Sequence, residues 1–325
     1  YDVGLTGLAL LTYLAHGETP ASPEFGTTID KAIKHLMARQ GPEGSYPQRW
    51  YEHPIAAYAL SEAYSMTKQS AIREKAKKAI DFIIAGQNSS GGFDYGLNNT
   101  ARDDISVMGW CAQAMKAAKI AGIDSPGLDS AMKKAADAIK RNYQGDSKGG
   151  WFTYTYTDRG RTHLSGVGVL SLQLLGQAKS AEVRGGLTEI GVLDPFNWPG
   201  AAWANVYYWY YNTQAKFHEG GDVWKNWNKQ FSVPLSKAQA ITEKAIEGPG
   251  GKMFDIGYWD TNNEVAGRVM DTALCTLMLE VYYRYLPTFQ KPEDLAAEAK
   301  AEPGQEKAIA AQDLDIQITV APPQR

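Results

Sequence analysis

Residues 79 to 93 read "AIDFIIAGQNSSGGF", and this pattern returns along the chain. Residues 32 to 46 read "AIKHLMARQGPEGSY", residues 138 to 151 read "AIKRNYQGDSKGGW", and a weaker copy, "AIEGPGGKMF", follows at residues 245 to 254. Each copy joins Ala-Ile, the end of a helical pattern, glycines and an aromatic residue. A long-period repeat of this kind predicts a fold built from copies of one supersecondary unit.

Two kinds of helix alternate around these repeats. The helix that each copy ends carries lysines and arginines on one side, so we call it an outer helix with a face in water. The pattern after each glycine turn is nearly uncharged, and such a helix must be buried. We predict inner helices that start near residues 2, 53, 103, 163, 203 and 269, and outer helices at about residues 27–40, 70–86, 127–143, 179–191 and 223–247. A sixth outer helix would precede Tyr1 or lie at residues 292–303.

Six buried helices that alternate with exposed ones predict an all-α fold, a single (α/α)6 toroid in which an inner ring is wrapped by an outer ring. We assign this domain to residues 1–288 and a C-terminal extension to residues 289–325. The extension contains the charged, alanine-rich stretch "KPEDLAAEAKAEPGQEKAIAAQ" and then "DLDIQITVAPPQR", which resembles a short strand ending in prolines. We interpret it as an appendage and not as a second domain.

Composition narrows the classes of partner. The chain has 325 residues, 44% of them hydrophobic, and a formal net charge of −3, which favours neither nucleic acid nor an anionic membrane surface as a partner. The longest apolar run, residues 3–15, is too short to span a membrane and lacks the basic start of a signal peptide. Cys111 and Cys275 lie in apolar helical patterns that favour free buried thiols. The chain starts without methionine, so we expect that an upstream segment was removed; the compartment, which could be extracytoplasmic, stays open.

The Gln, Gly-Gly, aromatic pattern that closes the outer helices resembles the glutamine-tryptophan repeat of squalene and hopene cyclases. Over about residues 2–286 the layout is similar to the α/α-toroid superfamily, which also includes protein prenyltransferase β subunits and the thioester domains of complement-like proteins. The resemblance implies a double ring of helices. It does not by itself carry a chemistry, because one fold hosts many functions.

The chemical motifs of these three families are incomplete here. Class II cyclases use an Asp-x-Asp-Asp acid, whereas residues 101–104 are Ala-Arg-Asp-Asp. Prenyltransferases bind zinc through Asp, Cys and His; Asp271 and Cys275 lie four residues apart, but no histidine follows them, so we predict no metal and no cofactor. The Cys-Gly-Glu-Gln thioester is absent from the sequence. Whether the protein is an enzyme therefore stays open.

In a double ring all inner helices run in the same direction, so the loops that feed them meet at one end, which we call the mouth. Aromatic residues that share a concavity with Arg, His and Asp are typical of a ligand site, and helix N-termini there suit an anionic group. The candidate acids and bases are Asp104, His163 and His53. The candidate ligand-binding residues are Arg49, Trp50, Arg102, Asp103, Arg161, Trp203, Tyr207, Trp259, Arg268 and Asp271.

Several of these residues also have a structural interpretation. Thr100 and Asp103 resemble a capping box, so we predict that Thr100 caps the inner helix, that Asp103 serves this cap, and that Asp104 faces the mouth with Arg102, His163 or Arg161 in reach. His53 precedes Pro54 and fits a helix boundary equally well. Phe93 and Trp151 are expected to staple outer helices together. The stripe Trp203, Tyr207, Tyr210 either lines the ring or packs its core.

Three classes of function remain. The first is a small-molecule or chain-like ligand site, whose sharpest version, a terpenoid cyclase, requires a dry apolar cavity and a protonated acid. The second is a carbohydrate-active or glycan-binding toroid. The third is a non-enzymatic module that binds a protein partner through its rim loops. A carboxylate beside an arginine is held ionised, so Asp104 next to Arg102 favours binding over cyclisation.

Overall fold

The computed structural model describes residues 1–47, 50–98, 102–193, 195–248, 251–262, 266–283 and 286–289. These residues belong to one compact unit, Tyr1–Gln290. The described residues are mostly helical and form two small sheets, which agrees with the all-α prediction. The predicted extension, residues 289–325, and the alternative sixth outer helix at residues 292–303 lie almost wholly outside the described residues.

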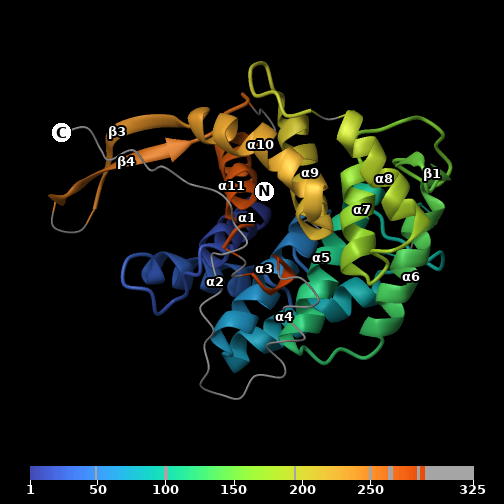
Figure 1. Cartoon of the computed structure of the whole chain (residues 1–325). Helices are drawn as coiled ribbons and strands as arrows, with labels where there is room; N and C mark the ends of the chain where they lie inside the picture. Colours follow the sequence, from blue (N-terminus) through green and yellow to red (C-terminus); the bar gives the residue numbers. More distant parts are fainter. Residues whose placement is uncertain are drawn as a thin grey trace, which may run out of the picture. The chain divides into compact units, whose positions relative to one another are not determined.

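Within these ranges the odd-numbered α-helices match the predicted inner helices and the even-numbered ones match the outer helices (Figure 1). The inner helices are α1 (Asp2–Ala15), α3 (Glu52–Thr67), α5 (Ile105–Ala121), α7 (Ser165–Leu174), α9 (Trp203–Glu219) and α11 (Gly267–Glu280). The outer helices are α2 (Gly26–Arg39), α4 (Ser70–Ala85), α6 (Leu128–Arg141), α8 (Ala181–Val192) and α10 (Gly221–Lys237). Every inner helix starts within two residues of its predicted position.

The inner helices contact one another in a closed order. Helix α1 packs against α3, α3 against α5, α5 against α7, α7 against α9, α9 against α11, and α11 against α1 again. Helices α2, α4, α6 and α8 each lie against two successive inner helices, and α10 lies against α9. The alternation of apolar and one-sided helices in the sequence therefore corresponds to a real difference in burial.

In the two clearest copies of the repeat, the glutamine side chain makes the same pair of hydrogen bonds. Gln40 Nε2 donates to the carbonyl of Gly44 at 3.2 Å and to a carbonyl of α4 at 2.9 Å. Gln87 Nε2 donates to the carbonyl of Gly91 at 2.8 Å and to a carbonyl of α6 at 2.9 Å. Gly44 and Gly91 have φ values of +89° and +93°, which favour glycine. Each glutamine thus closes its own turn and ties it to the next outer helix.

An aromatic side chain at the end of each glycine turn is buried and packs the turn against the core. Tyr46 and Phe93 are buried, as expected for residues that staple helices together. In the third copy the buried residue is Phe152, while Trp151 is only partly buried. The reason is local: the glycines of this copy lie in a hairpin of β1 (Tyr143–Asp146) and β2 (Gly149–Phe152), whose alternation turns Phe152 inward.

The weakest copy of the repeat was wrongly predicted as the end of a helix. Helix α10 ends at Lys237, and the predicted outer helix of residues 223–247 gives way to β3 (Ala240–Glu247), which pairs antiparallel with β4 (Met253–Tyr258) (Figure 1). Ile241, Thr242 and Ile246 are β-branched and favour a strand. Matching Ala-Ile and glycines alone could not separate a hairpin from a helix followed by a glycine turn.

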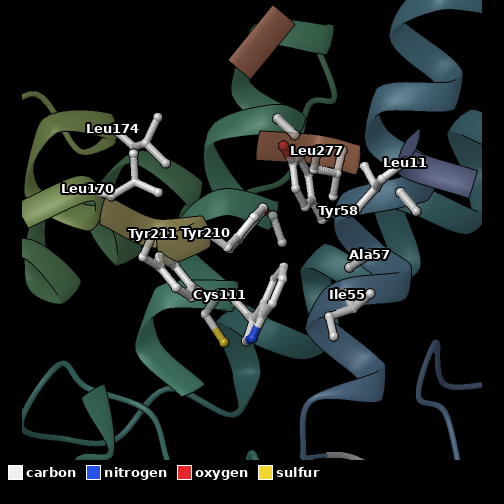
Figure 2. Close-up of a cluster of buried hydrophobic side chains, with 14 of the residues drawn as sticks. Leu11, Ile55, Ala57, Tyr58, Cys111, Leu170, Leu174, Tyr210, Tyr211 and Leu277 are labelled. Atoms are coloured by element: carbon white, nitrogen blue, oxygen red, sulfur yellow. The ribbon is translucent and has the colours of Figure 1, made fainter. Parts of the chain in front are cut away.

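Aromatic side chains of α3 and α9 lie in one buried cluster (Figure 2). Helices α5 and α9 do not follow one another in the order of contacts, yet Trp110 stacks on Tyr210 with ring centroids 5.6 Å apart and an interplanar angle of 20°. The Tyr210 hydroxyl donates to Gln113 Oε1 at 2.9 Å. Tyr58 of α3 lies in the same cluster and shares a 2.7 Å hydrogen bond with Thr288 in the short 3-10 helix η2 (Pro287–Phe289). Side chains from α3, α5 and α9 therefore meet in one cluster.

Cys111 and Cys275 are free and buried, as the apolar patterns around them predict. No helix in the described ranges is both long enough and apolar enough to cross a membrane.

Candidate functional site

Three of the predicted mouth loops meet at the start of α5. The backbone N–H of Asp104 donates to the carbonyl of Phe93 at 2.8 Å, and that of Ile105 donates to the carbonyl of Tyr154 at 3.0 Å. Tyr51, just before α3, shares a 2.9 Å hydrogen bond with Ser106. The loops that precede α3, α5 and α7 are thus held together at one helix start, as the parallel inner helices predict.

Asp104 is the N-cap of α5, which corrects the expectation that it has no capping role. Its Oδ1 accepts from the backbone N–H groups of Ser106 and Val107 at 3.0 and 3.2 Å, and from the Ser106 hydroxyl at 2.5 Å. The helix begins at Ile105, two residues later than predicted, so the cap position falls on the second aspartate. Thr100, the predicted cap, lies outside the described residues.

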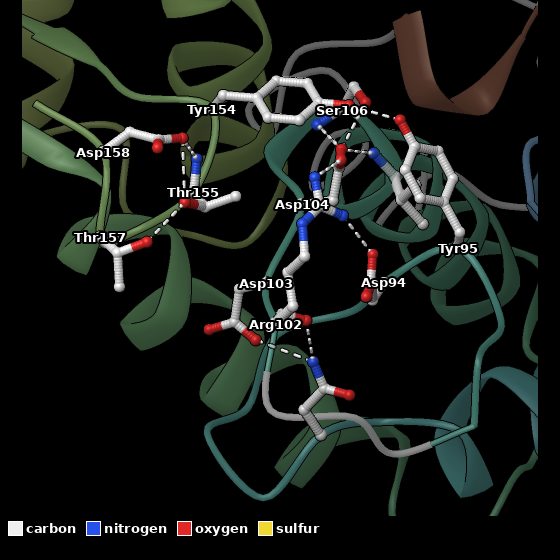
Figure 3. Close-up of polar contacts among 12 residues, drawn as sticks. Asp94, Tyr95, Arg102, Asp103, Asp104, Ser106, Tyr154, Thr155, Thr157 and Asp158 are labelled. Atoms are coloured by element: carbon white, nitrogen blue, oxygen red, sulfur yellow. Dashed lines mark hydrogen bonds and ion pairs between the residues drawn. The ribbon is translucent and has the colours of Figure 1, made fainter. Parts of the chain in front are cut away.

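Arg102 holds the second oxygen of Asp104, as predicted. Its Nη2 lies 3.0 Å from Asp104 Oδ2, and its Nη1 lies 2.5 Å from Asp94 Oδ1 (Figure 3). The guanidinium also lies over the rings of Tyr95 and Tyr154, 5.3 and 5.2 Å from their centroids. Burial lowers the pKa of Arg102, but the hydrogen bond with Tyr154 and the charges of the two carboxylates outweigh burial and raise it.

A row of hydroxyl groups leads from Asp104 toward the surface. The Tyr51 hydroxyl lies 2.9 Å from Ser106 Oγ and 3.5 Å from the Tyr95 hydroxyl, which in turn contacts the Tyr154 hydroxyl. Burial raises the pKa of Tyr51 and of Tyr154. Burial and the hydrogen bond with Tyr154 raise the pKa of Tyr95 to about 12. The three phenols therefore keep their protons near neutral pH.

Asp103 braces the repeat turn. Its Oδ1 accepts from Asn88 Nδ2 at 2.8 Å and from the Ser90 hydroxyl at 2.6 Å, and its Oδ2 lies 3.3 Å from Arg141. Asp103 is fully buried. Of its two interpretations, structural and ligand-binding, these contacts favour the structural one. Asp103 supports the glycine turn, however, and does not take part in a helix cap.

The other arginines predicted at the mouth are paired as well. Arg161 makes a two-pronged contact with Glu189 of α8, with Nη2 at 2.7 Å from Oε2, and lies over the ring of Trp151. Arg268 Nε lies 2.6 Å from Asp260 Oδ2. Hydrogen bonds from the Asn262 backbone and then from Arg268 outweigh the effect of burial and lower the pKa of Asp260. Arg49 lies outside the described residues.

The two candidate histidines pack elsewhere. His53 is fully buried, with Nε2 at 2.9 Å from the carbonyl of Ala79, so this nitrogen carries the proton. Its ring centroid lies 4.9 Å from that of Phe82, which makes it part of the contact between α3 and α4. His163 stacks on Tyr208 of α9 with an interplanar angle of 15°. These contacts connect helices and do not lead to Asp104.

Two further candidates fix the connection between β4 and α11. Asp271 is buried and accepts from the backbone N–H and hydroxyl of Thr261 at 2.8 and 2.6 Å. Trp259 Nε1 donates to the carbonyl of Leu235 at 2.8 Å. Across the described ranges, no group of three or more His, Cys, Asp or Glu side chains is arranged to hold a metal ion.

The predicted aromatic residues divide between surface and core. Trp50 and Trp203 are 52% and 42% exposed, and the Trp50 ring lies 5.6 Å from that of Tyr95. Tyr207 is buried against Tyr211 and Trp110. Tyr51, Asp94 and Ser106, which complete the site, were not predicted from the sequence. Their position in the sequence is the one signal that could have identified them. Asp94 follows the glycine-turn residue Phe93, Tyr51 follows Trp50, and Ser106 is the second residue of α5.

No protein-family model matches the chain, and no curated protein matches it either.

Proposed function

We propose that this chain is an (α/α)6 toroid of the squalene-cyclase-like kind that binds a ligand at its mouth without cyclising it. The closed order of contacts among the inner helices and the repeated glutamine tie support the toroid assignment. The binding site is the group that we call the mouth cluster; it consists of Tyr51, Asp94, Tyr95, Arg102, Asp104, Ser106 and Tyr154, with Trp50 at its edge.

The observation that carries this proposal is the clamp around Arg102. Two carboxylates and two tyrosine rings fix the guanidinium, while its own side chain stays 39% exposed. A polar group held this firmly at a surface next to an exposed tryptophan is a preorganised recognition element, because few of its rotamers are left to be lost on binding. Aromatic and arginine side chains are also the residues that contribute most to recognition.

Cyclisation has little support from the same residues. Both oxygens of Asp104 are engaged as acceptors, so this side chain is committed to the helix cap and to Arg102. The aromatic side chains of α5 and α9 meet inside the ring, where a cyclase would enclose its chain-like substrate. These contacts favour the binding of a ligand at the mouth over chemistry deep in the ring.

Binding of a protein partner is the second candidate, and the β3–β4 hairpin favours it. Every residue of β3 is exposed, and Ile241, Ile246 and Met253 are large apolar side chains with 56%, 53% and 44% exposure. An isolated two-stranded hairpin is only marginally stable in water, so a covering partner would stabilise it.

A fragment screen by ligand-observed NMR tests the main proposal. The two variants are Trp50→Ala in the mouth cluster and Val233→Ala on α10, both at exposed positions where the fold tolerates truncation. We expect fragments whose signals are lost with Trp50→Ala and kept with Val233→Ala. A chemically diverse library in which no fragment depends on Trp50 would exclude the mouth as a binding site.

A further inference from the structure

We propose that the ligand of the mouth cluster is a neutral, hydroxyl-rich molecule, a sugar unit of a glycan, whose apolar face stacks on Trp50 while its hydroxyl groups meet the tyrosine row. This inference rests on the proposed function and names the chemical class that the cluster selects. It follows from what the cluster already contains.

The described arginines that were predicted to bind an anionic ligand each face a carboxylate already. Arg102 faces both Asp94 and Asp104, so one guanidinium is outnumbered by two carboxylates. Arg161 and Arg268 each have a carboxylate of their own. The positive end of α5 is also engaged, because Asp104 accepts from two N–H groups of its first turn. A phosphate or carboxylate would have to displace a built-in carboxylate or approach it.

A cationic ligand meets the opposite obstacle. Tyr95 and Tyr154 have the arrangement that could receive an ammonium group between two aromatic faces. The Arg102 guanidinium already lies 5.3 and 5.2 Å from these ring centroids. The protein's own cation therefore fills the aromatic site, and a second positive charge beside it would be repelled.

The hydroxyl row has a direction, which makes it suited to hydroxyl groups. Ser106 gives its one proton to Asp104 Oδ1, so the Tyr51 hydroxyl must donate to Ser106. The oxygen of Tyr51 then accepts, and the outer hydroxyls of Tyr95 and Tyr154 keep lone pairs for a further donor. A sugar hydroxyl both donates and accepts, so it extends this row without leaving a polar atom unpaired. An isoprenoid chain in the same place would leave these groups desolvated and unpaired.

Trp50 supplies the apolar half of the site. Its side chain is 52% exposed and its ring is inclined at 59° to that of Tyr95, 5.6 Å away. A pyranose ring carries C–H groups on one face and hydroxyl groups around its edge. The neighbouring tryptophan and tyrosine hydroxyls provide one surface for each, which is the combination of apolar area and few polar groups that ligand sites use.

Titration calorimetry on the whole chain tests this inference with a panel of neutral gluco-, xylo-, manno- and galacto-oligosaccharides. The charged and apolar probes are inorganic phosphate, choline and farnesyl diphosphate. We expect at least one neutral oligosaccharide to bind, Trp50→Ala to weaken it by about tenfold or more, and Tyr95→Phe to weaken it by about fivefold, which correspond to one lost stacking contact and one lost hydrogen bond. Val233→Ala, at a 57% exposed position of α10, should leave the affinity unchanged.

The outcomes separate this inference from the proposal on which it rests. If phosphate, choline or farnesyl diphosphate binds in a Trp50-dependent way and no neutral oligosaccharide does, the ligand class is wrong and the binding site stands. If only a protein partner shows Trp50-dependent binding, the glycan assignment is likewise overturned. If neither the panel nor the fragment screen yields a Trp50-dependent ligand, both proposals fall.

Discussion

Thr288 of η2 donates both its hydroxyl and its backbone N–H to the same oxygen of Glu62 on α3, at 2.6 and 3.3 Å. These residues are 226 positions apart in the sequence, and both are buried. Burial raises the pKa of Glu62 to about 7, and the two hydrogen bonds from Thr288 oppose this rise only in part. This buried carboxyl group thus keeps its proton to a pH well above the range of an exposed glutamate.

The raised pKa of Glu62 predicts that stability falls with rising pH. The folded state holds this proton to a higher pH than the unfolded chain, so its contribution is complete below the ordinary pKa of 4.5 and is lost as the pH rises through about 7. The expected loss in the free energy of unfolding is about 3 kcal/mol between pH 4.5 and pH 8. Urea unfolding at a series of pH values measures it.

Glu62→Gln provides the control for this pH dependence. The amide keeps the shape and the acceptor oxygen for Thr288 but cannot ionise, so the variant should lose most of the Glu62 part of the slope. Burial also raises the pKa of Glu280, to about 8, and this carboxyl should supply the remaining slope in the same direction. A Glu62→Gln protein whose stability declines with pH as steeply as the native protein would contradict the assignment.

Asp104→Ala should destabilise the fold, because the residue caps α5 and also pairs with Arg102. Loss of a cap alone costs about 1 kcal/mol. The loss of buried hydrogen bonds to Ser106 and of an ionic partner raises the expected total to about 3 kcal/mol. Asp104→Asn keeps an acceptor for the helix start and should cost less. Equal stability of the alanine variant and the native protein in urea would refute the capping role.

The sequence predicted the helices better than the site because helix periodicity is local and ion pairing is not. The apolar stretch before Thr67 and the charged one after Ser70 reveal α3 and α4 directly. By contrast, Arg161 pairs with Glu189, which lies 28 positions away on another helix, and no pattern in the sequence connects the two. The arginines were expected to bind an anion because no carboxylate partner is visible for them in the sequence. In the folded protein Arg161 and Arg268 each have one.

The adjacent aspartates show a second limit, which is register. Helix boundaries shift by one or two residues without a clear signal in sequence. The sequence-based prediction placed the cap at Thr100, whereas the cap that forms is Asp104, and Asp103 then lies before the helix and supports the glycine turn. The sequence predicted which types of residue occur at this site. Which aspartate caps the helix and which one supports the turn depended on where the helix begins.

Gln40→Ala and Gln87→Ala should each destabilise the protein by about 2 kcal/mol, since each removes two hydrogen bonds to carbonyls of a glycine turn and an outer helix. The two turns are separate, so the double variant should show the sum of the single effects. Gln69→Ala is the matched control, because Gln69 is exposed and makes no side-chain cap to α4. Thermal or urea unfolding of the native protein and these four variants measures the differences. A Gln87→Ala protein as stable as the native one would show that the repeat glutamine is not a structural tie.

Gly92→Ala tests whether the Asp103 carboxyl group is held in place against the glycine turn. A Cβ at Gly92 would lie 2.3 Å from the carboxyl carbon of Asp103, closer than atoms can approach. Asp103 cannot move aside easily, because Asn88, Ser90 and Arg141 hold its carboxylate. We therefore expect a loss of about 1–3 kcal/mol in the free energy of unfolding, as for other overpacked sites.

Gly149→Ala is the comparison for Gly92→Ala, since a Cβ at Gly149 meets no atom within 4 Å although the residue belongs to the third copy of the same repeat. This variant should unfold within about 0.5 kcal/mol of the native protein. In an Asp103→Ala background the added cost of Gly92→Ala should shrink, because the carboxyl group that it strikes is gone. The Cβ of residue 103, 2.8 Å away, stays in this background, so the cost should not vanish. The same cost in both backgrounds would mean that the turn glycine is required for a reason other than its contact with the Asp103 carboxyl group.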